Sequence, residues 1–287
     1  MKGIILAAGK GTRLYPMTKP VCKPLLPVYD KPLIYYPIAI LMQAGISDIL
    51  IIVPPDETDT FADLLGVGSQ FGLHISYAEQ PVARGIADAL LIGSDFVGDD
   101  QVCLVLGDNI FYAPTLGATL KRAVRRAEGA TVFGYWVEDP RPFGVVEFDE
   151  KGKAISIEEK PRYPKSNYIV PGLYFYDHQV MDIARNLKPY ARGELEITDV
   201  NLEYLRRGQL QVVPLERNFV WLDAGTADSL LEAGTTVKHI QDTSGHYVGC
   251  LEELGLYEGW ITEDQVRTMG KELSMTRYGK YLLSLIG

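Results

Sequence analysis

Cysteine and histidine are scarce in this chain of 287 residues, and neither shows the spacing of a known metal site or catalytic motif. The three cysteines, Cys22, Cys103 and Cys250, lie far apart and form no C-x-x-C pair, which argues against a disulfide framework and against a zinc site. The four histidines, at positions 74, 178, 239 and 246, show no metal-ligand or catalytic-triad spacing. We therefore assign no catalytic role to the histidines.

Long apolar runs and a general excess of positive charge are also missing. The run Gly3–Gly9 is the bare minimum of a signal-peptide core, and Lys10 to Arg13 follow it without a cleavage-like continuation. The stretch Leu33–Met42 contains Pro37 and is half the ~20 residues that a membrane span requires. The formal net charge is −9, which argues against DNA or RNA as the main partner. We expect a cytoplasmic protein that binds neither a membrane nor a nucleic acid.

Positive charge is nevertheless concentrated near the N-terminus. Residues 1–31 carry a local net charge of +5 inside this acidic chain. The only acidic residue of the segment is Asp30, and its cations are Lys2, Lys10, Arg13, Lys19, Lys23 and Lys31. Such a short basic segment favours one small, highly charged ligand over a polymer.

The first half of the chain alternates short apolar runs with helical patterns. The expected strands are Lys2–Ala7, Asp48–Val53, His74–Ala78 and Val102–Leu106. The expected helices are Leu33–Ala44, Thr58–Leu65 and Gly85–Ile92. Repeated β-α-β units predict an α/β fold with a doubly wound, mostly parallel sheet that has helices on both faces.

The second half changes to strands separated by turns, which makes the predicted sheet mixed. Its expected strands are Thr131–Val137, Val145–Phe148, Ile155–Glu158, Leu173–Tyr176 and Leu210–Pro214. Its expected helices are His178–Leu187, Glu196–Arg207 and Ala227 to about Gln241. No linker interrupts the pattern, so we predict one domain over residues 1–241 and a helical C-terminal appendage over residues 242–287.

A glycine-rich turn leaves the first strand as Leu6-Ala7-Ala8-Gly9-Lys10-Gly11-Thr12-Arg13. Backbone N–H groups in such a turn can bind phosphate oxygens, and Lys10 and Arg13 add positive charge. The segment is not a Walker A loop, and Leu14 stands where a G-x-G-x-x-G fingerprint needs its third glycine. An ordinary turn is the alternative, but the clustering of glycines and cations favours phosphate binding.

Two carboxylates follow apolar strands, at the position where open α/β sheets bind their ligands. Asp108 comes directly after Leu104-Val105-Leu106-Gly107, and Asp223 follows Trp221-Leu222. Either could instead be a turn or capping residue. Beside a phosphate-binding loop, however, two such acids suit Mg²⁺, which is typically held by one or two carboxylates and by substrate phosphates.

Three further charged positions have ordinary alternatives. Lys23 lies between prolines on a stiff backbone, where a solvated loop lysine is the simpler interpretation. The clusters Glu158–Pro161 and Ala191–Thr198 could bind sugar hydroxyls and a phosphate, or could be surface ion pairs.

Taken together, these motifs resemble the sugar-1-phosphate nucleotidyltransferases over nearly the whole chain, and most closely the glucose-1-phosphate thymidylyltransferase group. The matching segments are Leu6–Pro16, Val28–Pro32, Leu106–Tyr112, Gly144–Phe148, Glu158–Tyr168, Pro171–Asp177, Arg192–Asp199 and Trp221–Thr226. The resemblance implies a Rossmann-like nucleotidyltransferase fold and transfer of a thymidylyl group from dTTP to glucose 1-phosphate, in dTDP-sugar biosynthesis such as the dTDP-rhamnose pathway.

The resemblance also implies roles for individual residues. Those expected at the nucleotide are Leu6, Ala7, Ala8, Gly9, Gly11, Thr12, Gln80, Gly85 and Asp108. Those expected at the sugar phosphate are Asn109, Gly144, Glu159, Val170, Tyr174 and Arg192. Arg13, Lys23 and Lys160 are the expected catalytic cations, and Asp108 and Asp223 the expected ligands of the Mg²⁺ cofactor.

Two alternatives remain open from the sequence. Ala8 and Pro24 depart from the thymidylyl-transferring pattern, and Ala8 is shared with uridylyl-transferring relatives, so transfer from UTP is the nearer rival. A non-catalytic sensor of sugar nucleotides is the other. The resemblance further implies a homotetramer, with the C-terminal segment at subunit contacts or at an effector site.

Overall fold

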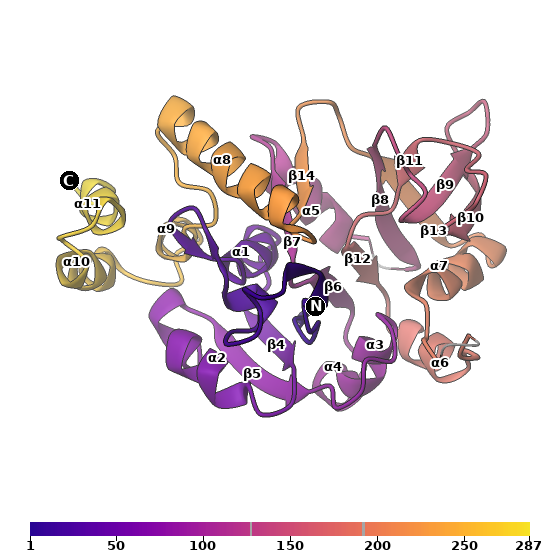
Figure 1. Cartoon of the computed structure of the whole chain (residues 1–287), viewed down its shortest axis with the longest axis horizontal. Helices are drawn as coiled ribbons and strands as arrows, with labels where there is room; N and C mark the ends of the chain where they lie inside the picture. Colours follow the sequence, from indigo (N-terminus) through magenta and orange to yellow (C-terminus); the bar gives the residue numbers. More distant parts are fainter. Residues whose placement is uncertain (127, 191–192) are drawn as a thin grey trace.

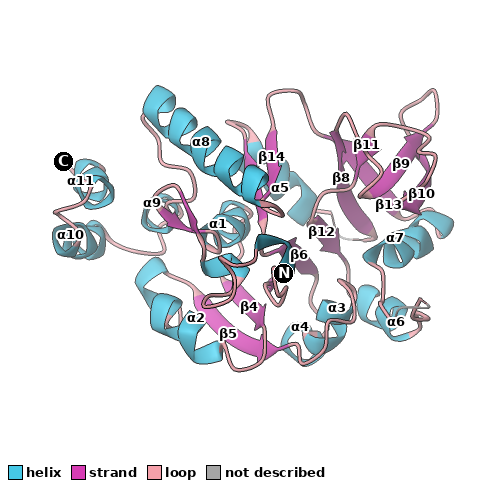
Figure 2. Cartoon of the chain, in the orientation of Figure 1, coloured by secondary structure: helices cyan, strands magenta, loops and turns pink. Residues whose placement is uncertain are grey.

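The centre of the protein is a mixed ten-stranded sheet with helices on both faces, as Figures 1 and 2 show. The computed structural model describes residues 1–126, 128–190 and 193–287. The strands in the main path run in the order β10-β9-β11-β8-β12-β6-β1-β4-β5, and β13 pairs with β8 beside that path. The predicted α/β architecture with its mostly parallel, mixed sheet is confirmed.

The strands of the main sheet are β1 (Lys2–Leu6), β4 (Asp48–Val53), β5 (His74–Glu79), β6 (Val102–Leu106), β8 (Ala130–Trp136), β9 (Gly144–Phe148), β10 (Ala154–Glu159), β11 (Tyr168–Ile169), β12 (Leu173–Tyr176) and β13 (Leu210–Pro214). Two small antiparallel ribbons stand apart from it. One pairs β2 (Pro27–Val28) with β3 (Lys31–Pro32), and the other pairs β7 (Asn109–Tyr112) with β14 (Val220–Asp223).

The parallel half of the sheet sets the position of the candidate site. Strand β1 lies between β4 and β6, and Leu6 is in register with Leu106. Two chain segments therefore leave the sheet side by side. Gly107 N donates to the carbonyl of Leu6 at 2.9 Å, and a Cβ on Gly107 would lie 3.0 Å from the Cα of Ala7. A residue without a side chain is needed for this approach, which brings the glycine-rich turn against the segment that carries Asp108.

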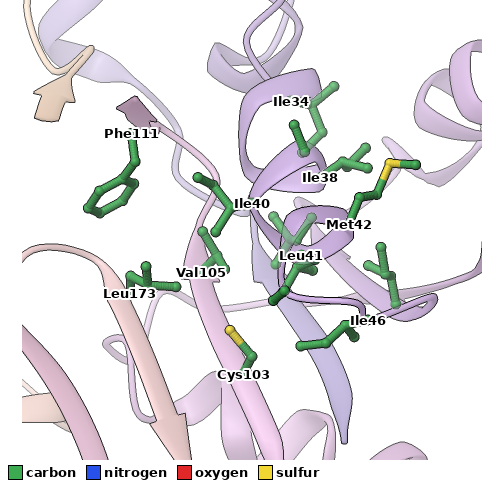
Figure 3. Packing of buried hydrophobic residues seen from close by; sticks show 14 of the residues in the cluster. Ile34, Ile38, Ile40, Leu41, Met42, Ile46, Cys103, Val105, Phe111 and Leu173 are labelled. Carbon is green, nitrogen blue, oxygen red and sulfur yellow. The ribbon is translucent and has the colours of Figure 1, made fainter. Parts of the chain in front are cut away.

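Eight of the described helices precede the C-terminal segment. They are α1 (Tyr35–Gln43), α2 (Thr58–Leu65), α3 (Asp88–Ile92), α4 (Ser94–Val97), α5 (Leu116–Val124), α6 (Val180–Arg185), α7 (Ile197–Arg206) and α8 (Ala227–Ser244), with 3₁₀ turns at Thr12–Leu14, Lys23–Leu25 and Ser69–Phe71. Figure 3 shows Ile40 and Leu41 of α1 beside Val105 and Cys103 of β6, in the large core cluster on that face. Burying each such side chain contributes about 1.5–3 kcal/mol, so α1 is fixed on the sheet by its apolar residues.

The C-terminal segment is helical, as predicted, with α9 (Leu251–Tyr257), α10 (Glu263–Glu272) and α11 (Arg277–Ser284). Helices α10 and α11 lie at the far end of the molecule from the antiparallel half of the sheet (Figure 1). Helix α8 continues to Ser244, past the boundary proposed at residue 241. Gln241 there bonds Lys31 and Asp30 of the β2–β3 ribbon, at 3.2 and 2.9 Å.

Several predicted boundaries were wrong for local reasons. The helix expected at Gly85–Ile92 begins only at Asp88, because Gly85 has φ +93° and lies against another loop. The helix expected at Leu33–Ala44 begins at Tyr35. Strands β7 and β11 and helix α5 were not predicted at all, and the strand that ends at Asp223, β14, was predicted without bounds. Among the described residues, no helix is both long enough and apolar enough to span a bilayer.

Candidate active site

The glycine-rich turn after β1 packs directly on Lys23. Gly11 has φ +59°, and a Cβ there would lie 3.0 Å from Cβ of Lys23 and 3.1 Å from Cγ2 of Thr18. The hydroxyl of Thr18 donates to the carbonyl of Gly11 at 2.7 Å. Ala7 and Ala8 are buried, Leu6 is half-buried, and Gly9, Lys10, Thr12 and Arg13 are exposed. The turn is thus fixed from behind, and its glycine and cation side faces solvent.

Asp108 and Asp223 come together through the β7–β14 ribbon. The antiparallel pairing places Asp223 opposite Asn109, and Ala224 N donates to the carbonyl of Asp108 at 3.2 Å. Lys23 lies between the two carboxylates, with Nζ 2.5 Å from Oδ2 of Asp108 and 3.9 Å from Oδ1 of Asp223. The structure therefore joins the turn, the lysine and both acids, which are far apart in sequence, at one edge of the sheet.

The environment of Asp223 disfavours a lone negative charge. Burial raises the pKa of its carboxyl above the usual range, and the charge of Asp108 raises it further, while Lys23 and Arg13 oppose the shift. Its Oδ1 atom is buried and has no hydrogen-bond partner among the described residues. A divalent cation bound to both carboxylates, in addition to the charge of Lys23, would relieve both conditions.

These carboxylates fit a magnesium ion. The described part of the chain contains no group of three or more His, Cys, Asp or Glu residues arranged for a metal, so the protein offers two carboxylate ligands here. Mg²⁺ commonly takes only one or two carboxylates, because it keeps waters and binds substrate phosphates. The observation that supports this fit is the buried Oδ1 of Asp223, which accepts no hydrogen bond from the part of the chain that the structure describes.

Gly225 lies beside both Asp223 and Arg13. A Cβ on this residue would lie 3.2 Å from both carboxylate oxygens of Asp223 and 3.3 Å from Nη2 of Arg13. The absence of a side chain here therefore leaves room for the guanidinium and the carboxylate. Arg13 is exposed, so its donors remain available to an anionic ligand.

Asn109, expected at the sugar phosphate, has its side chain turned to Asp108. It is 3% exposed, and its Nδ2 donates to Oδ1 of Asp108 at 2.8 Å. Its Oδ1 accepts from the indole of Trp221 at 2.7 Å and from Gly172 N at 3.1 Å. Trp221 was not predicted as a site residue; its spacing of two residues from Asp223 is the signal that could have shown a shared strand face.

The residues expected at the sugar form a second group beside the first. The hydroxyl of Thr198 donates to Oε2 of Glu159 at 2.6 Å, and Nζ of Lys160 lies 3.0 Å from Oε1 of the same carboxylate. Gly144 lies beside them, since a Cβ there would be 3.1 Å from Oγ1 of Thr198. Glu159 and Lys160 also line a cavity of about 490 Å³.

Tyr174 lies between the two groups. It is on β12, which pairs with β6, and it is buried. Burial raises the pKa of its hydroxyl, and the negative charges of Glu159 and Asp108 raise it further. The phenol is therefore neutral at physiological pH. Val170, also buried, donates its N–H to the carbonyl of Gly144 at 2.8 Å.

Gln80 and Gly85, expected at the base, lie on the other side of the glycine-rich turn. Gln80 is buried, and its amide donates to Asp88 at 2.9 Å. The segment is joined to the loop before α7, because Leu195 N donates to the carbonyl of Arg84 at 2.7 Å and Ala87 N donates to that of Leu195 at 3.2 Å. Arg192, expected at the sugar phosphate, lies outside the described residues.

Comparison with known proteins gives one consistent result. The model of the nucleotidyl transferase family matches residues 2–239. The chain is 55% identical over 287 residues to a glucose-1-phosphate thymidylyltransferase of Neisseria gonorrhoeae, covering 100% of both chains. It is 56% identical over 286 residues to the enzyme of that name from Mycolicibacterium smegmatis, covering 100% of this chain and 99% of the relative.

Solved structures agree on the fold. The crystal structure of a candidate glucose-1-phosphate thymidylyltransferase from Bacillus anthracis, in complex with sucrose, matches with a TM-score of 0.77 and 45% identity, over 82% of this chain and 94% of the other. A UDP-glucose pyrophosphorylase in complex with UDP-glucose matches with a TM-score of 0.73 over 83% and 98% of the two chains. At 24% identity, that second likeness supports the fold alone.

Proposed function

Because this chain belongs to the nucleotidyl transferase family, we propose that it transfers the thymidylyl group of dTTP to glucose 1-phosphate, forming dTDP-glucose and pyrophosphate. The observation that carries the proposal is the position of Lys23, held between Asp108 and Asp223 beside the glycine-rich turn. Cations and a carboxylate pair placed together suit the joining of two phosphates. Relatives that are 55% and 56% identical to this chain over its full length carry the name glucose-1-phosphate thymidylyltransferase.

Asp108 and Asp223 are proposed to hold Mg²⁺. When bound, the ion would act as a Lewis acid and as a template for the triphosphate. Two observations support this assignment. Oδ1 of Asp223 accepts no hydrogen bond from the described residues, and burial and the charge of Asp108 raise the pKa of its carboxyl. In the chain itself, Lys23 is the cation that already balances these charges.

The chemistry we propose is a single in-line displacement. A phosphate oxygen of glucose 1-phosphate forms a bond to the α-phosphorus of dTTP, and the bond from that phosphorus to the bridging oxygen of pyrophosphate breaks. Because the nucleophile is already an anion, no general base is required. The task of the protein is to bring two anions together and to stabilise the charge of the transition state.

The chain's own cations are assigned to separate phosphates. We assign Lys23 to the reacting phosphate, Lys160 to the sugar phosphate and Arg13 to the leaving pyrophosphate. Lys160 is exposed beside Glu159, which is available to sugar hydroxyls. Alignment of this kind contributes on the order of 7–11 kcal/mol to lowering a barrier. Arg192 is assigned to the sugar phosphate with Lys160 on the resemblance alone.

Base recognition is assigned to the segment that carries Gln80 and Gly85. The amide of Gln80 is oriented by Asp88, and the close approach of Gly85 to Leu195 fixes the loop. Asp88 also accepts from Arg84 at 2.7 Å, so this carboxylate anchors two side chains of the segment. Asp88 is only 1% exposed, and such an anchor keeps the base-binding segment rigid.

The test is a pyrophosphate-release assay that crosses four nucleoside triphosphates with several sugar 1-phosphates. The expected result is Mg²⁺-dependent release that is fastest with dTTP and glucose 1-phosphate. A clearly higher kcat/KM for UTP than for dTTP would replace the proposal by uridylyl transfer. Ala8 and Pro24, which depart from the thymidylyl-transferring pattern, favour that alternative. No release with any pair would leave a non-catalytic sugar-nucleotide sensor.

We further propose the setting in which the enzyme works. The absence of a spanning helix in the described residues and the implied product suit a cytoplasmic enzyme of dTDP-sugar biosynthesis, such as the dTDP-rhamnose pathway. A homotetramer is proposed, with the helices after α8 at subunit contacts or at an effector site. Analytical ultracentrifugation tests it: the expected species is four times the 31.9 kDa chain, and a monomer contradicts the proposal.

A further inference from the structure

A chain of hydrogen bonds runs from a tryptophan to a proposed metal ligand. The indole Nε1–H of Trp221 donates to Oδ1 of Asn109 at 2.7 Å, and Nδ2 of Asn109 donates to Oδ1 of Asp108 at 2.8 Å. Lys23 bonds the other oxygen of Asp108 at 2.5 Å. Each oxygen of this carboxylate therefore has one donor, and the donor on the Oδ1 side is itself oriented by the indole.

The direction of the Asn109 amide depends on its neighbours. Its oxygen accepts from two N–H groups, the indole of Trp221 and the backbone of Gly172 at 3.1 Å. Two donors on one side require an oxygen there, which places the NH₂ group against Asp108. If the amide rotated by half a turn, its oxygen would face the carboxylate and repel it. Since the side chain is 3% exposed, water cannot readily take the place of either donor.

The ring of Trp221 is itself held in place. Its ring centroid lies 5.4 Å from that of Phe143 and 5.5 Å from that of Tyr135. Trp221 and Asp223 are two residues apart on β14, so their side chains leave the same face of the strand. Strand β14 thus supplies the carboxylate of Asp223 directly, and its Trp221 contacts the carboxylate of Asp108 through Asn109.

We propose that Trp221 is a positioning residue, which sets the orientation of Asp108 for the divalent cation through the amide of Asn109. The inference rests on the proposed metal site and adds a residue that neither the glycine-rich turn nor the carboxylate pair contains. Groups hydrogen-bonded to metal ligands typically change metal affinity or activity by about 10–100-fold when they are removed. The indole N–H acts one hydrogen bond further from the ligand, and Gly172 still donates to Asn109 when the indole is removed. Its removal is therefore expected to weaken metal binding by about 10-fold, the lower end of that range.

The experiment measures Mn²⁺ binding to the full-length protein, without and with dTTP and always without sugar phosphate. Free Mn²⁺ is followed by electron paramagnetic resonance for the wild type, Trp221→Phe and the control Trp136→Phe. Phenylalanine keeps an aromatic ring between Tyr135 and Phe143 but removes the N–H donor. Trp136 is 57% exposed at the end of β8, so its replacement removes an indole that has no part in this hydrogen-bond chain.

A second measurement does not depend on the folding of Trp221→Phe. The chain has three tryptophans, so the wild type gives three indole ¹H–¹⁵N signals. The signals missing from Trp136→Phe and from Trp260→Phe identify those two residues, and the third signal belongs to Trp221. Titration with Mg²⁺ should shift the Trp221 signal and leave those of Trp136 and Trp260 in place.

The outcomes separate this inference from the metal site on which it rests. A Mn²⁺ dissociation constant about 10-fold higher in Trp221→Phe, with Trp136→Phe within twofold of the wild type, supports the role. The role of Trp221 is overturned if Trp221→Phe binds Mn²⁺ with wild-type affinity, or if the Trp221 indole signal does not shift when Mg²⁺ binds. Neither result contradicts the metal site itself. If the wild type itself binds no Mn²⁺ under either condition, the metal assignment and this role both fall.

Discussion

Replacement of Gly85 by alanine should loosen the join between the base-side segment and the loop before α7. A Cβ on Gly85 would lie 2.4 Å from the carbonyl oxygen of Leu195 and 2.8 Å from its nitrogen. Both atoms belong to backbone, which cannot move aside as the end of a side chain can. The 2.4 Å contact is well inside the 3.0 Å that Cβ atoms tolerate, so one of the two segments must shift.

The expected cost has two parts. Gly85 has φ +93°, and a left-handed backbone costs an L-residue roughly 1–2 kcal/mol. Forcing extra volume into a packed site costs typically about 1–3 kcal/mol more. We therefore expect Gly85→Ala to lower the free energy of unfolding by about 2–5 kcal/mol. It should also raise the KM for dTTP, because the shifted segment is the one assigned to the base.

Urea denaturation measures the first effect, and Gly152→Ala is the matched control. Gly152 also has a positive φ, +75°, but a Cβ there would meet nothing within 4 Å. The control isolates the conformational part, so Gly85→Ala should be about 1–3 kcal/mol less stable than Gly152→Ala. If the two variants unfold at the same urea concentration with the same m-value, the steric argument is refuted.

Three further substitutions test other parts of the site and of the fold. Asp108→Asn should lower kcat by on the order of 10³-fold or more while the circular dichroism spectrum stays unchanged, since several kcal/mol of electrostatic stabilisation are lost; near-normal turnover would remove Asp108 from the mechanism. Lys23→Met should abolish turnover and lower the stability of the metal-free protein by about 3 kcal/mol, because two carboxylates lose their shared cation. Added Mg²⁺ should then raise Tm more in Lys23→Met than in the wild type, and an equal rise in both would contradict the shared-charge interpretation. In the C-terminal segment, burial raises the pKa of Glu252 above its ordinary value of 4.5, so the folded protein prefers the protonated form and stability is lost as pH rises through that raised pKa. Glu252→Gln should therefore have a higher Tm than the wild type at pH 8 and an equal Tm near pH 4, as scanning calorimetry can check; a pH-independent difference would contradict the assignment.

The central parallel strands and the two acids could be predicted from the sequence because both depend on local patterns. Runs such as Val102–Leu106 are short, apolar and bounded by turn residues, and Asp108 follows one of them directly. Strands β1 and β6 are parallel, with Leu6 paired to Leu106, and the carboxyl ends of parallel strands lie at the same edge of the sheet. The loops that follow these two strands therefore lie together.

Other features depend on contacts between distant segments and could not be predicted in this way. Strands β7 and β14 are four residues each and stabilise one another across more than a hundred residues of sequence, so neither has a strong pattern of its own. The sequence pattern favours a helix that begins at Gly85, but the close approach of Gly85 to the backbone of Leu195 prevents a helix there. The direction of the Asn109 side chain follows from Trp221 and Gly172, which are remote in sequence.

The measurement that tests the central claim most directly is the configuration at phosphorus during transfer. The enzyme is given the Sp isomer of dTTP with sulfur on the α-phosphorus, together with glucose 1-phosphate, and the configuration of the thio-substituted dTDP-glucose is determined by ³¹P NMR. A single displacement, in which Lys23, Lys160 and Arg13 act only on phosphate charges, predicts inversion. Retention would show two displacements through a nucleotidyl group bound covalently to the protein, and it would contradict the account.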